Sequence, residues 1–204
     1  MRAAILTAAG ALVVAIVGVA IWLSFAQRPV ELSPAMVNVQ GADVGGPFQL
    51  TAQTGERITS EELIDGPTLI YFGYTFCPDV CPVDTQIMAQ AVDILAEQGI
   101  EVTPVFITVD PERDTPEALA DYAEAVHPEM IALSGTPEEI RAAADAYKVF
   151  YQKVETPGSA AGYLMNHTAY FYLMTPEQGL TALFRRDVTP ESLASDIARV
   201  LGAV

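Results

Sequence analysis

Apolar runs of strand length alternate with segments of helical periodicity along most of the chain after residue 46. Residues 67–74 and 102–109 are near-continuous apolar runs, which is typical of strands buried on both faces of a sheet. Threonine followed by proline marks three helix starts. The pattern predicts strands over residues 67–74, 102–109, 130–133, 150–154, 169–174 and 180–184, and helices over residues 83–99 and from residues 115, 136 and 189.

Two hairpins flank the alternating part of the sequence. Residues 48–52 and 56–59 alternate around a turn at Gly55, and the strands at 169–174 and 180–184 surround a second glycine turn. The order of hairpin, strand–helix units, closing hairpin and last helix predicts an α/β fold with a central, largely parallel β-sheet flanked by helices. Turn-forming residues at 156–162 predict an internal loop.

The N-terminal segment differs in kind from the rest. Residues 3–26 carry no charge, and this run is longer than the about 7–15 apolar residues of a signal-peptide core. It predicts that residues 1–28 form an uncleaved signal anchor with one transmembrane helix, although small residues at 24 and 26 leave cleavage as an alternative. Residues 29–46, with prolines, glycines and no periodicity, predict a linker, and residues 47–204 predict one domain.

The predicted membrane topology and the charge of the chain limit the classes of partner that this domain can have. A short N-terminus normally stays cytoplasmic, so the anchor predicts a single-pass protein of the inner membrane whose domain faces the periplasm. The formal net charge is −16, and every acidic residue follows Arg28. This charge excludes nucleic acid as a partner and repels anionic lipid headgroups. Solubility is the simpler explanation of the charge, and steering toward a basic partner is the alternative.

The two cysteines of the chain, Cys77 and Cys81, lie in the predicted turn between strand 67–74 and helix 83–99. The positive end of a helix favours the thiolate, the form of cysteine that binds soft metals and attacks disulfides. If both residues were helical, their Cβ atoms would be about 5–6 Å apart, whereas a relaxed disulfide needs about 3.5–4.5 Å. The pair therefore suits metal binding or reversible redox chemistry, and an inert disulfide is the alternative.

His167 is the candidate nitrogen ligand, because it lies just before the strand at 169–174, where a loop reaches the sheet edge. A hydrogen-bonded structural histidine is the alternative, and His127 is predicted to cap a helix C-terminus instead. Two thiolates and one imidazole form a soft ligand set that suits copper as Cu(I) or Cu(II). Zinc would need a fourth ligand, for which Asp79 and Asp84 are candidates.

Two methionines are further possible ligands. A thioether is a soft donor, so Met88 and Met165 are candidates beside the thiolates. A methionine among apolar neighbours more often fills space in a hydrophobic core. We therefore expect both side chains to pack in the core.

Three motifs resemble the SCO/SenC family of cytochrome oxidase assembly proteins. They are TFCPDVCP at residues 75–82, VDPERDTP at 109–116 and MNHT at 165–168, and the resemblance extends over roughly residues 45–203. It implies a thioredoxin-like fold in which Cys77, Cys81 and His167 bind copper. The family's aspartates map onto Asp110 and Asp114. A carboxylate there would orient His167 through its second ring nitrogen or offset the charge of Cu(II), and helix capping is the alternative for Asp114.

The resemblance implies a copper metallochaperone rather than an enzyme. Its partner would be the cytochrome c oxidase subunit that carries the binuclear CuA centre, with another periplasmic copper chaperone or a thiol reductase as further candidates. The alternative is a thiol-disulfide oxidoreductase that reduces partner cysteines through Cys77 and Cys81. Three residues between the cysteines, instead of the two of thioredoxin, and the presence of His167 disfavour it. A peroxiredoxin-like peroxidase is disfavoured because Thr75 lies two residues before Cys77 rather than three.

Overall fold

The structure is a computed structural model that describes residues 17, 34–37, 39, 41–158 and 161–203. Apart from Val17, the predicted anchor over residues 1–28 lies outside the described residues. Within the described ranges, no helix has both the length and the apolar character needed to cross a membrane.

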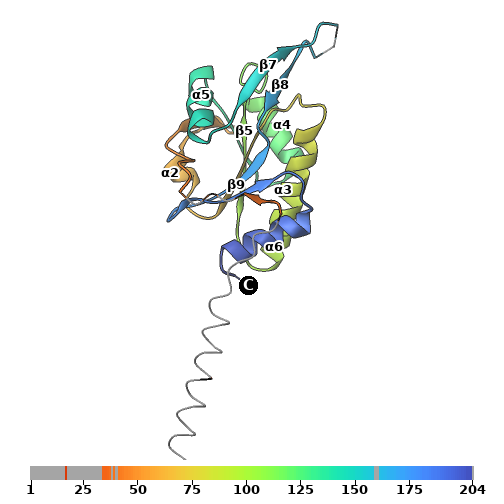
Figure 1. The fold of residues 1–204 in the computed structure, drawn as a ribbon. Coiled ribbons are helices and arrows are strands. Elements are labelled where there is room, and N and C mark those ends of the chain that lie inside the picture. The colour runs from red at the N-terminus through yellow and green to blue at the C-terminus, as the bar shows by residue number, and fades with distance from the viewer. Residues whose placement is uncertain (1–16, 18–33, 38, 40, 159–160, 204) are drawn as a thin grey trace, which may run out of the picture. The chain divides into compact units, whose positions relative to one another are not determined.

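An eight-stranded sheet forms the centre of the domain, with helices on both of its faces (Figure 1). Helices α3, α4 and α6 lie on one side and α2 and α5 on the other. The strands follow the order β1-β10-β9-β4-β5-β6-β2-β3. Their bounds are β1 Met36–Val37, β2 Gln49–Ala52, β3 Arg57–Thr59, β4 Thr68–Gly73, β5 Thr103–Thr108, β6 Ile131–Ser134, β9 Tyr170–Thr175 and β10 Gly179–Arg185. The helices are α2 Ser60–Leu63, α3 Val80–Glu97, α4 Pro116–Val126, α5 Pro137–Ala146 and α6 Pro190–Val200.

The sheet is mixed, so the prediction of a largely parallel sheet was wrong. Only β4–β5 and β5–β6 pair in parallel, and the other pairs of this sheet are antiparallel. Short turns join strands only in antiparallel fashion, so each predicted hairpin adds antiparallel strands to an edge of the parallel centre. The central sheet with flanking helices otherwise agrees with the α/β prediction and with the thioredoxin-like architecture that the resemblance implies.

Two segments behave differently from the sequence prediction. Met36–Val37, placed in the predicted linker 29–46, pairs with β10 at the edge of the sheet, so part of that segment belongs to the domain. Tyr151–Glu155 (β7) and Tyr163–His167 (β8) form a separate two-stranded antiparallel ribbon. The strand β8 was not predicted, and it carries His167.

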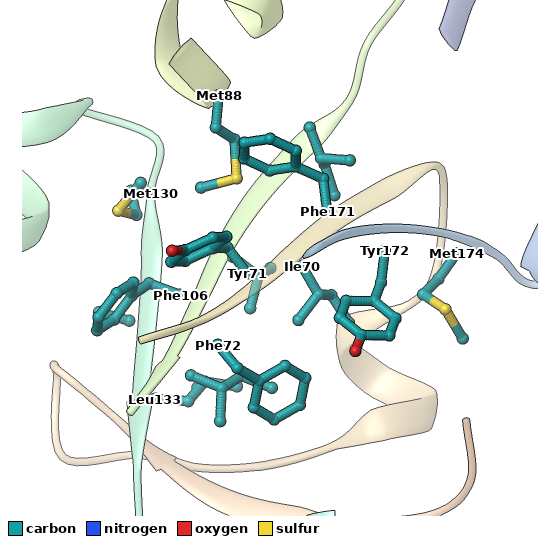
Figure 2. Close-up of a cluster of buried hydrophobic side chains, with 14 of the residues drawn as sticks. Ile70, Tyr71, Phe72, Met88, Phe106, Met130, Leu133, Phe171, Tyr172 and Met174 are labelled. Carbon is teal, nitrogen blue, oxygen red and sulfur yellow. The ribbon is translucent and has the colours of Figure 1, made fainter. Parts of the chain in front are cut away.

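The core lies on both faces of the central strands (Figure 2). Consecutive residues of a strand point to opposite faces. Tyr71 therefore packs with Phe106 and Phe171 on the face of α3, whereas Phe72 contacts Tyr147 and Tyr172 on the other face. The strand that leads to the cysteines is thus buried on both faces, as its apolar run predicts.

Helix starts agree with the sequence. Three threonines cap helices that begin with proline: Thr115, Thr136 and Thr189. Each threonine side chain accepts a hydrogen bond from a backbone N–H of the first turn. The burial along α3 does not simply follow hydrophobicity, because Val83 is 54% exposed while Asp84 is completely buried. Asp84 is buried because its carboxylate accepts hydrogen bonds from Tyr71 and Arg186.

Candidate metal centre

The end of β4 and the start of α3 place the two sulfurs. Cys77 lies in the turn after β4, and Cys81 lies in the first turn of α3. Cys77 is half-buried and Cys81 is completely buried, and both are free thiols. The Cys81 backbone N–H donates to Cys77 Sγ over 3.4 Å. Unpaired N–H groups and the dipole at a helix start favour negative charge, so they stabilise the Cys77 thiolate.

A glycine makes room for the buried sulfur. A Cβ atom on Gly73, the last residue of β4, would lie 3.2 Å from Cys81 Sγ and 2.8 Å from Phe106 Cε2. Contacts below 3.0 Å are closer than real Cβ atoms allow. The absence of a side chain at this position therefore lets Cys81 pack directly against the sheet.

His167 brings a nitrogen to the sulfurs from the last position of β8. Its Nε2 lies 3.3 Å from Cys81 Sγ, and its Nδ1 lies 3.0 Å from the Thr168 carbonyl oxygen. A carbonyl only accepts hydrogen bonds, so Nδ1 carries the proton of the neutral ring. The lone pair of Nε2 is then directed at the sulfurs, which is the state a metal ligand needs.

These three side chains form a compact donor set. The Sγ atoms of Cys77 and Cys81 and a ring nitrogen of His167 all lie within 4.8 Å of one another. Among the residues that the structure describes, no other cysteine, histidine, aspartate or glutamate joins this group. Two soft sulfurs and one imidazole match the preferences of copper, while a tetrahedral zinc site would lack its fourth protein ligand.

The two thiols differ in acidity. Hydrogen bonding with Cys81 holds the pKa of Cys77 far below its usual value, against the opposing effect of desolvation. The same hydrogen bond with Cys77, together with burial, raises the pKa of Cys81. One proton is therefore retained on Cys81 while Cys77 is the thiolate at neutral pH.

Asp79 and Asp84, the candidate fourth ligands for zinc, do not lie with the three donor side chains. Asp79 is exposed, and Asp84 accepts hydrogen bonds from the Tyr71 hydroxyl at 2.9 Å and from Arg186 Nε at 3.1 Å. These contacts explain why Asp84 is buried on the inner face of α3. Neither carboxylate joins the donor set.

Asp110 and Asp114 do not orient His167, because the second ring nitrogen of His167, Nδ1, donates its hydrogen bond to the Thr168 carbonyl oxygen. Asp114 accepts from the Thr75 backbone N–H at 3.0 Å and from the Thr75 hydroxyl at 2.6 Å, and desolvation raises its pKa. The helix cap that was its alternative role belongs to Thr115. Asp110 forms an ion pair with Arg113 at 2.6 Å. Both aspartates thus hold the turns around the site.

Three further side chains behave as expected. His127 is the C-cap residue of α4, and its Nε2 lies 3.2 Å from an Asp93 carboxylate oxygen. Met88 and Met165 belong to the hydrophobic core. These residues thus occupy the helix-cap and core positions that the sequence predicts.

Two tyrosines beside the donor set were not predicted. The rings of Tyr71 and Tyr74 stand edge-on to the His167 ring, with centroid distances of 6.2 and 5.9 Å. Tyr71 lies in β4 and Tyr74 directly follows this strand, so both precede Cys77 in the chain. The only available signal was strand alternation, which turns Tyr71 toward the helix that carries Cys81.

Comparisons with known proteins agree with this geometry. A family model described as SCO1/SenC matches residues 37–202. The chain is 42% identical over 200 residues to Protein SenC of Rhodobacter capsulatus, covering 97% of this chain and 90% of that protein. Among solved structures, Arabidopsis thaliana ScoI with copper bound gives a TM-score of 0.75 at 38% identity, covering 79% of this chain and 99% of that one. Bradyrhizobium japonicum ScoI with copper bound gives 0.69 at 41% identity, covering 77% and 99%.

Proposed function

Because the chain belongs to the SCO1/SenC family, we propose that it is a metallochaperone that binds copper through Cys77, Cys81 and His167. The observation that carries this proposal is the convergence of the three donor atoms within 4.8 Å. Copper is the cargo here, to be bound and then released to a partner. The copper-bound structures of the two ScoI relatives support the choice of metal.

The three ligands enter the reaction in different states. The Cys77 thiolate and the Nε2 lone pair of His167 are ready to bind a cation, whereas the Cys81 thiol must first release its proton. Thiolates favour Cu(I), and the imidazole allows the set to accept Cu(II) as well. Each copper ion taken up therefore displaces one proton from Cys81 into solvent.

The partner that fits the family is the cytochrome c oxidase subunit that carries the CuA centre, to which copper is delivered or whose site is prepared for it. Another periplasmic copper chaperone or a thiol reductase would act before this step.

We further infer that residues 1–28 anchor the protein in the inner membrane with the domain in the periplasm. An uncharged run over residues 3–26 supports the anchor, and the net charge of −16 argues against nucleic acid.

A second function, thiol-disulfide exchange, is favoured by the unequal acidity of the two thiols. The Cys77 thiolate would attack a partner disulfide, forming a mixed disulfide and releasing one partner thiolate. After losing its proton, Cys81 would attack Cys77 Sγ, forming the Cys77–Cys81 disulfide and releasing the second partner thiolate. Two electrons pass from the dithiol to the partner in this reaction.

Titration of the reduced protein with Cu(II), followed by visible absorption, tests the copper proposal. Wild-type protein should show thiolate-to-copper charge transfer at one equivalent, and Cys77→Ser or Cys81→Ser should abolish it. His127→Ala is the matched control, because His127 is the other histidine of the chain and lies at the C-cap of α4. Absence of the band in wild-type protein, together with rapid reduction of a partner disulfide, would favour the oxidoreductase instead.

A further inference from the structure

The turn at residues 110–114 lies between β5 and α4 and touches both segments that carry the candidate ligands. At one end, Asp114 accepts two hydrogen bonds from Thr75, two residues before Cys77. At the other end, Asp110 accepts a hydrogen bond of 2.9 Å from the Tyr163 hydroxyl, at the start of the strand that ends in His167. We name residues 110–114 the bridging turn.

Arg113 joins the bridging turn to the ribbon through its guanidinium group. Its Nη1 donates to the carbonyl oxygens of Ala161 at 3.1 Å and Tyr163 at 3.2 Å, and its Nε donates to Asp110 at 2.6 Å. Its guanidinium carbon also lies 3.7 Å from the centroid of the Tyr163 ring. These contacts hold the ribbon at the end opposite His167.

The same guanidinium touches the segment that carries Cys77. It lies 4.8 Å from the centroid of the Phe76 ring and 5.8 Å from that of Tyr74. A planar cation that stacks on rings and donates in several directions is specific to arginine. Arg113 thus contacts the neighbours of one sulfur ligand and the base of the strand that supplies the nitrogen ligand.

The ribbon needs such a contact because its backbone does not pair with the main sheet. Among the described strands, β7 and β8 pair only with each other. Tyr163 and His167 are four positions apart, which is about 13 Å along a strand. With one end continuing into β9 and the other held by Arg113, the tilt of the ribbon is defined, and with it the position of the imidazole.

We propose that Arg113 is a positioning residue that sets the distance between the His167 imidazole and the two sulfurs by tying the β7–β8 ribbon to the Cys77 segment. The proposal rests on the metal-binding function proposed above, but it also predicts a property of the metal-free protein. Without Arg113, the bridging turn would keep only side-chain contacts to the described strands of the ribbon, from Asp110 to Tyr163 and from Glu112 to Lys153, and the ribbon would shift about residue 168. The copper ligands on α3 and its preceding turn would keep their own geometry.

The test uses Arg113→Lys in the full chain, because lysine keeps a cation beside Asp110 yet cannot stack and donate to two carbonyl oxygens together. Amide hydrogen exchange of residues 163–167 in the metal-free protein should accelerate about tenfold or more. Cu(II) affinity should fall about tenfold, and in the His167→Ala background the same substitution should cause no further loss. Arg57→Lys is the matched control, since Arg57 also donates to a carboxylate and a carbonyl, at Glu139 and Gln49.

A second variant, Asp110→Asn with Arg113→Met, removes both charges so that neither is left unpaired, and it should reproduce both effects. Unchanged exchange at residues 163–167 would overturn the proposal. So would an equal loss of copper affinity with and without His167, because that result indicates general destabilisation. If wild-type protein binds no copper, the metal-binding function fails, and hydrogen exchange alone then decides whether Arg113 holds the ribbon.

Discussion

His167 reaches the sulfurs with its ring already in the tautomer that binds metal. The Thr168 carbonyl occupies Nδ1, so no proton has to move within the ring when a cation arrives at Nε2. Cys77 is likewise prepared as a thiolate, and only Cys81 has to change state. At the scale of single residues, the site is pre-organised in two of its three ligands.

Replacing the imidazole should separate copper binding from thiol chemistry. We expect His167→Ala to lower Cu(II) affinity more than the about 10–100-fold loss typical of residues that only support a metal ligand. Thiol-disulfide exchange through Cys77 and Cys81 should continue, because neither sulfur is removed. Competition titration against a Cu(II) chelator measures the first effect, and exchange with a model disulfide measures the second. An unchanged Cu(II) affinity and spectrum would remove His167 from the site.

The acidity of Cys77 predicts an unusual pH profile. A free cysteine with a pKa of about 8.5 loses about tenfold in alkylation rate for each pH unit below that value. Because the pKa of Cys77 is lowered, its thiolate persists as the pH falls, so its alkylation rate should stay nearly constant from pH 9 to pH 6. Mass spectrometry of iodoacetamide-treated, metal-free protein measures the rate at Cys77. A tenfold decrease between pH 7 and pH 6 would contradict the lowered pKa.

At the scale of elements, the junction of β4 with α3 makes the donor set possible. The strand ends in a residue without a side chain, and the helix then starts with its first turn against that residue. The buried sulfur, the sheet and the aromatic core therefore meet at one point. A larger side chain at Gly73 would therefore displace groups, including Cys81, that also define the geometry of the metal centre.

Gly73→Ala tests this junction. The added methyl group would contact Phe106, Tyr71 and Cys81, so we expect a loss of about 1–3 kcal/mol in the free energy of unfolding, as in other overpacked cores. Urea denaturation measures the change. Gly66→Ala is the control, because a Cβ atom at Gly66 meets nothing within 4 Å. Equal stability of the two variants would show that the junction has spare room.

The sequence predicts elements better than it predicts pairing. The apolar runs of β4 and β5 and the threonine caps of α4, α5 and α6 leave local signals, and those elements lie where expected. The strand β8 has no such signal, because in a two-stranded ribbon its side chains show mixed burial rather than regular alternation. The burial of Asp84 also depends on distant partners, Tyr71 and Arg186.

The site shows the same limit. Motifs and chemistry bring Cys77, Cys81 and His167 forward as one group, and the structure places their donor atoms together. The contacts of Asp110 and Asp114 could not be predicted: Asp114 accepts from Thr75 across the chain, which depends on where two distant turns meet, and Asp110 pairs with Arg113 inside its own turn, whose conformation leaves no signal in the sequence. A motif therefore identifies charged residues near the site, but it does not show which contacts those residues make.

At the scale of the whole molecule, the sheet and helices described above lie, apart from Met36 of β1, in the segment matched by the family model, residues 37–202. We expect deletion of residues 1–28 to leave a soluble, folded, acidic domain, because its core is formed by residues that follow the deletion. Circular dichroism and size-exclusion chromatography in detergent-free buffer measure the result. Aggregation with loss of the folded spectrum would contradict it.

Copper and a disulfide should exclude each other across the molecule's working cycle. Copper needs both sulfurs as thiolates, and the oxidised pair offers none. We expect copper uptake only after reduction, with a Cys77–Cys81 reduction potential above the roughly −300 mV bound of structural disulfides. Copper titration of the oxidised and reduced protein, and equilibration with a dithiol buffer, measure these quantities. Equal copper uptake by the oxidised form would disprove the exclusion.

The pairing of β7 with β8 also decides which atom is offered to the sulfurs. Tyr151 pairs with His167 and Lys153 with Met165, and side chains two residues apart on a strand share a face. A slip of one residue would turn the amide of Asn166 toward the sulfurs, and a slip of two would bring the thioether of Met165 there. Imidazole accommodates both oxidation states of copper, whereas a thioether selects Cu(I). The register of a short ribbon therefore sets the valence preference of the metal that the sulfurs hold.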